Sequence, residues 1–472
     1  MYSFIVRGIK DLFQDSLENI IRTRDAALNK GDIAELLCDD SKVARNQIIF
    51  ICLSYALAAF DFIIYLKLAP TIGTVFFPAT DNALLIQLKL IGLVSVGFLS
   101  RPLGALLIGR YGDKRGRKPA LMLSVSFLSI TTFLVAFLPT YAQIGVVAPI
   151  LFLVIRILQG IAFGAHAPLS WVFIAEHAPK NRLVTYCSLA VAGGIFGSML
   201  AVTCAKVLTG TLDSGAMLSY GWRIPALIGG LFGGLSFLIW PHVKETPIFT
   251  NANNNQSANP STLETQPFVT RSSALMLSIV LSFVRASLIM VIMLLLPKLI
   301  ELKFYNDPSF LINASLVALV MQILGCVIYG ILADKMGTGK VFMLASMALI
   351  VQIWVLYAYL DNGHEIYVLP MYGLLGFCTG MIGLCIAIFV QVFPTNMRLT
   401  AVSVVYNVIS AILGAVLPLF LFYATKHISF APALYLTFIG MLSFIVGLHL
   451  HQRETFGELH TNPSSMHKKY HL

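Results

Sequence analysis

Long uninterrupted runs of apolar residues dominate this 472-residue chain, and short polar segments separate them. A helix needs about 20 apolar residues to cross the roughly 30 Å hydrocarbon core of a bilayer. Twelve runs of suitable length can be placed, at 47–69, 84–109, 119–138, 147–175, 183–208, 223–241, 272–300, 310–333, 341–360, 365–391, 399–424 and 429–450. The pattern therefore predicts an all-α integral membrane protein with twelve transmembrane helices.

One polar segment, residues 242–271, separates the first six runs from the last six. It holds the sequence Asn-Ala-Asn-Asn-Asn-Gln and Pro260, which is typical of a flexible linker. The pattern therefore predicts two six-helix bundles joined by this linker and flanked by polar tails. The bundles span 47–241 and 272–450, and the tails span 1–46 and 451–472.

The N-terminal tail carries apolar residues at helical spacing from Phe4 to Ile21. This spacing predicts an amphipathic helix on the membrane surface, and a loosely ordered tail is the alternative. The tail lacks an apolar region followed by a small-residue cleavage site, so we do not expect a signal peptide.

Composition and charge narrow the class of protein further. The chain is 57% hydrophobic and 11% charged, with a mean hydropathy of +0.82, which excludes a soluble globule. Its net charge of +10 comes from bases dispersed over short loops, so we expect a lipid surface as the partner and no nucleic acid. Most of the lysines and arginines fall on the side of the two tails, which predicts that both termini are cytoplasmic.

Enzymatic, cofactor and metal chemistry is not expected from the sequence. The seven cysteines form no C-x-x-C pair and lie mostly in apolar runs, where thiols behave as small hydrophobes. His364 and Glu365 are followed by Val368 where a zinc protease motif requires a second histidine. We expect no disulfide framework, no metal site, no cofactor and no catalytic residue.

A basic segment follows the second apolar run. Small residues in that run, Gly97, Gly104, Ala105 and Gly109, leave room for close helix packing. After it, Asp113 stands among bases, and Gly112 and Gly116 allow a tight turn. The residues Gly109, Asp113, Lys114, Gly116, Arg117 and Lys118 together resemble the signature loop between helices 2 and 3 of the major facilitator superfamily. The resemblance implies that superfamily's fold of two pseudo-symmetric six-helix halves.

Two internal repeats support paired halves. Gly330, Asp334 and Gly337 reproduce the spacing of Gly109, Asp113 and Gly116. The sequence AEHAPKNR at 175–182 is echoed by QVFPTNMR at 391–398, after the fourth and tenth runs. Paired halves with a site between them are typical of alternating-access transporters.

Further motifs resemble the metabolite:proton symporter family, which holds proline/betaine, α-ketoglutarate, citrate and shikimate permeases. They are FDFIIY at 60–65, SRPLGALLIGRYGDKRGRK at 100–118, RILQG at 156–160, AEHAPKNR at 175–182, GWRIP at 221–225, FPTNMR at 393–398 and VYNVISAILG at 405–414. Two positions depart from the family pattern, because Ala165 and His166 follow Gly164 where an acid is usual and Gln391 replaces a glutamate. The family's substrates and coupling therefore do not transfer directly.

Ionisable residues inside apolar runs are the candidate functional groups, because each is costly in hydrocarbon unless paired or hydrated. Asp61 in the first run is the candidate proton carrier, and the family pattern places Arg156 beside it. Desolvation favours the protonated carboxyl and a nearby cation favours the carboxylate, so the separation of the pair can control protonation. A permanent ion pair that locks two helices is the alternative.

The fourth run carries a second group of candidates. Arg156, Gln159, Phe163 and His166 fall within about an 80° arc of a helix, which predicts that this stripe faces a cavity. His166 is a candidate for proton transfer or substrate contact, with a histidine hydrogen-bonded to a neighbouring backbone carbonyl as the alternative. Arg285 in the seventh run suits carboxylate recognition, with helix packing as the alternative.

Arg101 and Asp113 bracket the inner end of the second run, and Asp334 occupies the equivalent position in the second half. We expect charge contacts there to hold a cytoplasmic gate, with a purely topogenic charge cluster as the alternative.

The sequence is best interpreted as a secondary active transporter for proton-coupled symport of a small carboxylate or zwitterion, such as a dicarboxylate, proline or betaine. An exporter, a sodium-coupled carrier and a membrane nutrient sensor are the alternatives. We expect a multi-pass protein of the bacterial inner membrane that functions as a monomer.

Overall fold

The computed structural model describes residues 41–78, 95–239, 243–250, 272–297, 308–361 and 365–455, together with residues 92 and 300. Every regular element in those ranges is a helix. The amphipathic helix expected between Phe4 and Ile21 lies outside the described residues, as does most of the expected linker.

Among its described residues, the first half contains six principal α-helices and three short α-helices. The principal helices are α3 (Ser41–Lys67), α6 (Arg101–Arg115), α7 (Arg117–Ala136), α9 (Val147–His177), α10 (Leu183–Thr211) and α12 (Ile224–Ile239). The short helices are α4 (Ala69–Phe76), α8 (Tyr141–Ile144) and α11 (Ser214–Ser219).

The second half repeats this order. Its helices are α14 (Ser272–Met290), which continues as a π-helical turn over Val291–Leu295, then α16 (Pro308–Met336), α17 (Thr338–Asp361), α18 (Glu365–Thr379), α19 (Ile382–Val392), α20 (Arg398–His427) and α21 (Ala431–Thr455). The tenth apolar run forms two helices, because the chain leaves helical geometry at Gly380 and Met381.

Within the described ranges, ten helical segments are long and apolar enough to cross a membrane. The two other expected spans, 84–109 and 223–241, overlap α6 and α12, whose described lengths are 15 and 16 residues. The all-helical membrane architecture expected from the apolar pattern is therefore confirmed.

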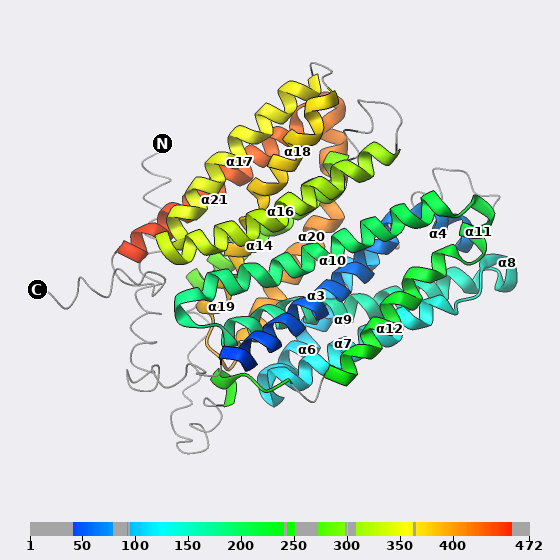
Figure 1. The fold of residues 1–472 in the computed structure, drawn as a ribbon, viewed down its shortest axis with the longest axis horizontal. Coiled ribbons are helices and arrows are strands. Elements are labelled where there is room, and N and C mark those ends of the chain that lie inside the picture. Colours follow the sequence, from blue (N-terminus) through cyan, green and yellow to red (C-terminus); the bar gives the residue numbers. More distant parts are fainter. Residues whose placement is uncertain are drawn as a thin grey trace, which may run out of the picture.

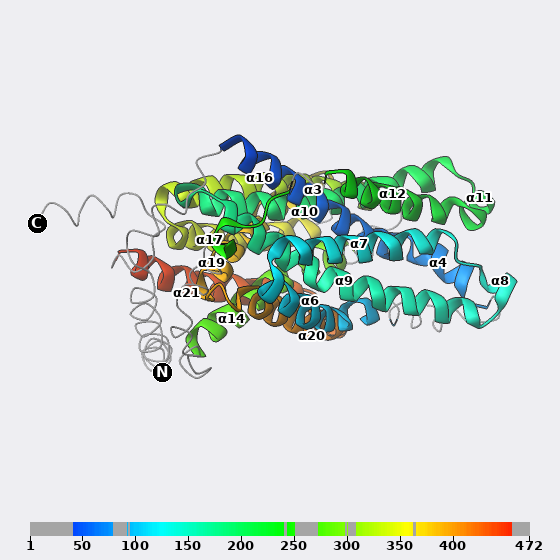
Figure 2. The same ribbon diagram turned by 90° about the horizontal axis from the view of Figure 1, so that it is seen from below.

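The two halves meet mainly where α10 packs against α16 and α19, and where α20 packs against α6 and α9. Figure 1 shows α10 beside α16, and α6 packs against α20. The short helices α4, α8 and α11 lie together at one end of the molecule in both views (Figure 2). The opposite end, where α6 meets α7 and α16 meets α17, is called here the signature-loop end.

Small residues set the distance between α6 and α9. A methyl group at Gly104 would overlap the main chain of Ile161 in α9, so no larger side chain fits there. Helix pairs in membranes use such small residues for close approach, as the sequence predicted for Gly104.

The two signature loops share one backbone geometry. Gly116 and Gly337 precede α7 and α17 with φ angles of +112° and +97°, values that glycine adopts readily. A glutamate then caps each following helix. Glu245 accepts hydrogen bonds from the amides of Arg117 and Lys118, at 3.0 Å each, and Glu454 accepts them from Thr338 and Gly339, at 2.7 and 3.2 Å. A carboxylate at a helix N-terminus satisfies free amides and complements the helix dipole.

We expect Gly116→Ala to lower the unfolding free energy by at least about 1 kcal/mol, because the alanine must adopt a disfavoured φ and its methyl group meets the Glu245 carboxylate. Gly210→Ala in α10 is the matched control, since no atom of the described residues lies within 4 Å of the added methyl group. Thermal unfolding of the purified protein measures the difference. Equal melting temperatures for the two variants would contradict the role assigned to Gly116.

Candidate functional site

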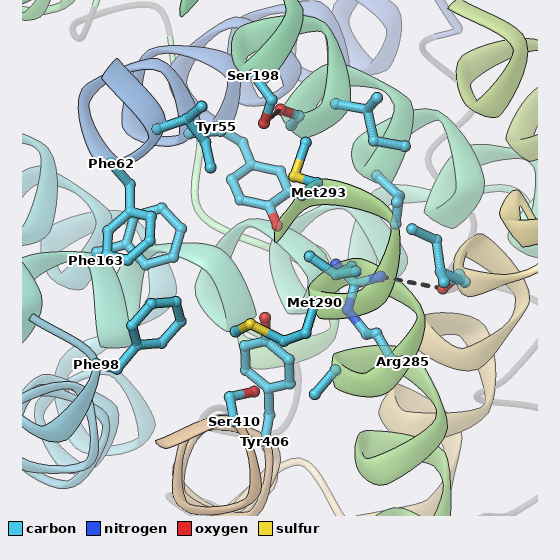
Figure 3. A pocket seen from close by; sticks show the side chains of 18 of the residues that line it. Tyr55, Phe62, Phe98, Phe163, Ser198, Arg285, Met290, Met293, Tyr406 and Ser410 are labelled. Carbon is cyan, nitrogen blue, oxygen red and sulfur yellow. Dashed lines mark hydrogen bonds between the residues drawn. The ribbon is translucent and has the colours of Figure 1, made fainter. Parts of the chain in front are cut away.

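A central cavity of about 100 Å³ lies between the two halves. A buried site needs roughly 10–15 Å³ of such space for each water, so the cavity has room for a small metabolite. The first half contributes Tyr55, Phe62, Phe98, Arg101 and Phe163, and the second half contributes Arg285, Met290, Met293, Gln322, Tyr406 and Ser410 (Figure 3). The site is therefore complete only when both halves are present.

Arg285 extends from α14 toward the first half. Its side chain is buried, and its Nη1 donates a hydrogen bond to the Ile382 carbonyl at 3.2 Å. Its guanidinium carbon lies 4.7 Å from the centre of the Trp171 ring, which belongs to α9 of the opposite half. Its Nε has no hydrogen-bond partner among the residues that the structure describes. The structure thus places Arg285 at the cavity, where a carboxylate can reach it.

The position of Arg101 differs from the expectation. It begins α6, whereas Asp113 lies at the other end of that helix, so the two residues do not bracket one gate. The Arg101 guanidinium is buried in the cavity wall, 4.1, 4.2 and 4.4 Å from the ring centres of Phe62, Phe98 and Phe163. The sequence prediction failed here because helix rise separates residues 101 and 113 by about 18 Å.

Asp61 is buried in α3 next to the cavity residue Phe62. Its Oδ1 accepts a hydrogen bond from the Thr132 hydroxyl at 2.7 Å and a longer one from Gln159 Nε2 at 3.4 Å. Arg156 Nη1 donates to the Oε1 of the same glutamine at 3.0 Å. Gln159 therefore connects Asp61 to Arg156, and the two charged groups form no ion pair within 4 Å in this structure.

The stripe expected on α9 is buried, but its residues have different surroundings. Phe163 lines the central cavity. His166 does not line it, because its two ring nitrogens lie 3.1 Å from the hydroxyls of Ser54 and Ser124. His166 therefore joins α3, α7 and α9 within the first half, through side-chain hydroxyls and not through the backbone carbonyl expected in the alternative.

The signature-loop end is closed by hydrogen bonds between the halves. Asp113 accepts hydrogen bonds from the amides of Leu399 and Thr400, at 3.1 and 2.8 Å, in the first turn of α20. Asp334 mirrors this contact with the amides of Val184 and Thr185, at 3.0 and 2.8 Å, in α10. Each half thus caps a helix of the other half.

A buried ionic cluster reinforces the same end. Glu176 at the end of α9 pairs with Arg117 at 3.2 Å and with Arg398, the first residue of α20, at 2.8 Å. Arg117 Nη2 also donates to the Thr395 carbonyl of the second half at 2.6 Å. Lys114 of the same loop is exposed, and Lys118 contributes its amide to the cap on α7.

Several site residues were not predicted from the sequence. Thr132 is a hydroxyl in an apolar run, and Tyr55 and Tyr406 are aromatic residues of a kind common in membrane helices. The motif around Glu176 and Arg398 was recognised as a repeat, but their ion pair was not. Only contacts between distant helices reveal these roles.

Comparison with known proteins identifies relatives along most of the chain. A proline/betaine transporter of Salmonella typhimurium is 28% identical over 446 residues, which cover 91% of this chain and 87% of that protein. A glycine betaine/proline/ectoine/pipecolic acid transporter of Dickeya dadantii is 24% identical, covering 88% of this chain and 84% of that protein.

Solved structures share the fold at low sequence identity. The proton:xylose symporter XylE bound to 6-bromo-6-deoxy-D-glucose matches with a TM-score of 0.74 and 16% identity, covering 88% of this chain and 96% of that one. The inward-open form of XylE from E. coli matches with a TM-score of 0.60, also at 16% identity, covering 86% and 95%. The sequence model of the Major Facilitator Superfamily matches residues 51–418, and this chain belongs to that family of membrane transporters.

Proposed function

We propose that this chain is a proton-coupled symporter that moves a small carboxylate or zwitterion, such as a dicarboxylate, proline or betaine, by alternating access. The observation that carries the proposal is a central cavity, built by both halves and lined by two arginines, together with the buried Asp61, whose sequence neighbour Phe62 lines that cavity. Relatives named for proline and betaine transport, and a structural neighbour named as a proton symporter, support this class.

Alternating access requires contacts that form at one end and separate later in the cycle. The caps made by Asp113 and Asp334, together with the Glu176–Arg398 pair, suit this role because each joins one half to the other. We infer that rocking of the halves breaks these contacts and opens the central cavity to the signature-loop end.

Proton coupling requires a carboxyl whose ionisation depends on its surroundings. Asp61 meets this requirement because Gln159 bridges it to the cationic Arg156 by hydrogen bonds. A change of the Gln159 rotamer alone can break this bridge, without movement of a helix. When the bridge breaks, the desolvated carboxyl favours its protonated form. Phe62 follows Asp61 in α3 and lines the central cavity. Substrate bound against Phe62 can therefore influence the protonation of Asp61.

The central cavity is complete within one chain, so we propose that a monomer transports. We further propose that the signature-loop end faces the cytoplasm of a bacterial inner membrane, because bases concentrate in loops on the cytoplasmic side.

We expect single cysteines placed in residues 242–271 to react with membrane-impermeant reagents only after the cell interior is opened, because this segment connects to the signature-loop end. Cysteines near α11, at the opposite end, should react from outside. Labelling in intact and permeabilised cells measures both. External labelling of the 242–271 segment would refute the proposed orientation.

We expect Asp113→Asn to leave membrane insertion intact and to slow uptake, because the cap on α20 loses its charge. Loss of such an interaction is worth about 1 kcal/mol, which shifts the equilibrium between the closed and open forms of the signature-loop end roughly fivefold.

Ser188→Cys provides a reporter of this opening, since Ser188 is buried against Gly330 and Gly383 of the other half. Faster maleimide labelling of this cysteine in Asp113→Asn is the expected result, and unchanged labelling with normal uptake would reduce the loop to a topology signal.

We expect Asp61→Asn to abolish accumulation driven by a proton gradient while substrate exchange continues, because the amide mimics the protonated carboxyl permanently. Asp213→Asn is the control, since Asp213 is exposed and caps the short helix α11. Uptake of labelled carboxylates into vesicles, with and without a proton gradient, measures both variants. Accumulation with alkalinisation of the medium by Asp61→Asn would place the coupling site elsewhere.

A further inference from the structure

A second, smaller cavity adjoins the central cavity. It encloses about 20 Å³, which is room for about one water, and it shares Ile63, Leu66 and Met293 with the central cavity. Its other lining residues are Lys67, Val202, Ile292, Ser315, Leu319 and Tyr372. This small cavity is called here the neck.

The neck lies on the side of the central cavity that faces away from the signature-loop end. On α10, Ser198 lines the central cavity, and Val202, one turn further from the signature-loop end, lines the neck. On α16, which runs toward the signature-loop end, Gln322 lines the central cavity and Leu319 lines the neck. Lys67 ends α3, and the next helix is α4 at the opposite end of the molecule (Figure 2). The neck therefore lies between the central cavity and that opposite end.

The neck is a narrow passage with mainly apolar walls. The first half supplies α3 and α10, and the second half supplies α14, α16 and α18, so the width of the neck depends on how the halves are placed. The Tyr372 hydroxyl donates its hydrogen bond to the Ile292 carbonyl. Apolar walls of this kind disfavour the passage of a charged group that has no counter-charge.

Lys67 supplies a charge at this passage. It is half-buried, and among the described residues that line the neck it alone carries a charge. No ion pair or hydrogen bond joins its ammonium group to another described residue. Lys206, one turn beyond Val202 on α10, differs because its ammonium donates to Asn313 of the other half at 2.6 Å. The Lys67 ammonium is therefore available to an incoming anion.

We propose that the neck is an outer subsite for small organic carboxylates, at which Lys67 captures the carboxylate before it reaches the central cavity. A positive charge in a passage with low-dielectric walls concentrates anions and raises their association rate. The subsite requires only a carboxylate, which dicarboxylates, proline and betaine all carry. The inference rests on the proposed function only in taking the central cavity as the destination of the substrate.

The test uses charged thiol reagents, so it depends neither on the identity of the substrate nor on transport. Ser198→Cys places a thiol in the central cavity of the purified full-length protein in nanodiscs (Figure 3). The rate constants of its reaction with the anionic sulfonatoethyl and the cationic trimethylammonioethyl methanethiosulfonate are measured, and the rates of the protein without Ser198→Cys are subtracted.

We expect Lys67→Gln to lower the ratio of the anionic to the cationic rate constant at least about fivefold at low ionic strength, because one charge acts on both reagents in opposite directions. Lys67→Arg should preserve the ratio. A second neutral variant, Lys67→Met, keeps the apolar stem and replaces Lys67→Gln if that variant does not fold.

Lys426→Gln is the matched control, because it removes the same charge from an exposed position at the corresponding end of α20 that lines neither cavity. An equal fall of the ratio in this control assigns the effect to general surface charge and overturns the proposal. A lysine that only anchors α3 at the lipid headgroups leaves the ratio unchanged, which also overturns it. The same holds if the Ser198→Cys thiol reacts with neither reagent.

Uptake into vesicles relates the subsite to transport, with glycine betaine, proline and succinate as probes. For each probe that is taken up, Lys67→Gln should raise KM about fivefold and leave the maximal rate unchanged. A lower maximal rate at an unchanged KM places Lys67 in the conformational cycle and overturns the capture role. If none of the three is taken up by the unsubstituted protein, the proposed function fails for these substrates, and the reagent ratio still decides the role of Lys67.

Discussion

Helix N-termini carry free backbone amides, and the way this chain satisfies them organises the molecule. Four carboxylates cap four helices at the signature-loop end, two in each half. Asp113 and Asp334 cap helices of the opposite half, so their hydrogen bonds exist only when the halves are together. The repeated sequence G-x-x-x-D-x-x-G thus has a direct physical meaning, because it supplies one carboxylate and one glycine turn to each half.

The centre of the molecule follows a different electrostatic arrangement. Asp61 and Arg156 are separated by a neutral amide, whereas Arg101 and Arg285 face a cavity whose described lining residues include no carboxylate. A protein interior tolerates such charges only with partial compensation, which aromatic rings provide here for both cavity arginines. Two buried cations thus line the cavity with no carboxylate among the described residues around them.

Sequence reasoning predicted the helices well because apolar run length is a strong signal in a membrane protein. It also identified Asp61, Gln159 and Arg285 as buried polar residues of interest. It placed His166 with the cavity residues because periodicity reports the face of a helix and not the neighbouring helix, and α3 and α7 cover that position with Ser54 and Ser124. The packing of three phenylalanine rings around the Arg101 guanidinium was not predicted, since Phe62, Phe98 and Phe163 meet only in the folded structure.

The caps made by Glu245 and Glu454 have a consequence for how the molecule moves. Each ties the start of the third helix of one half to the segment that ends that half, so both bonds lie within a rigid unit. The amides of Arg117 and Thr338 therefore stay shielded from solvent exchange throughout a rocking cycle. The amides of Thr400 and Thr185 are shielded by carboxylates of the opposite half, and water reaches them whenever the signature-loop end opens. Deuterium uptake at these two threonines consequently reports the opening of the signature-loop end.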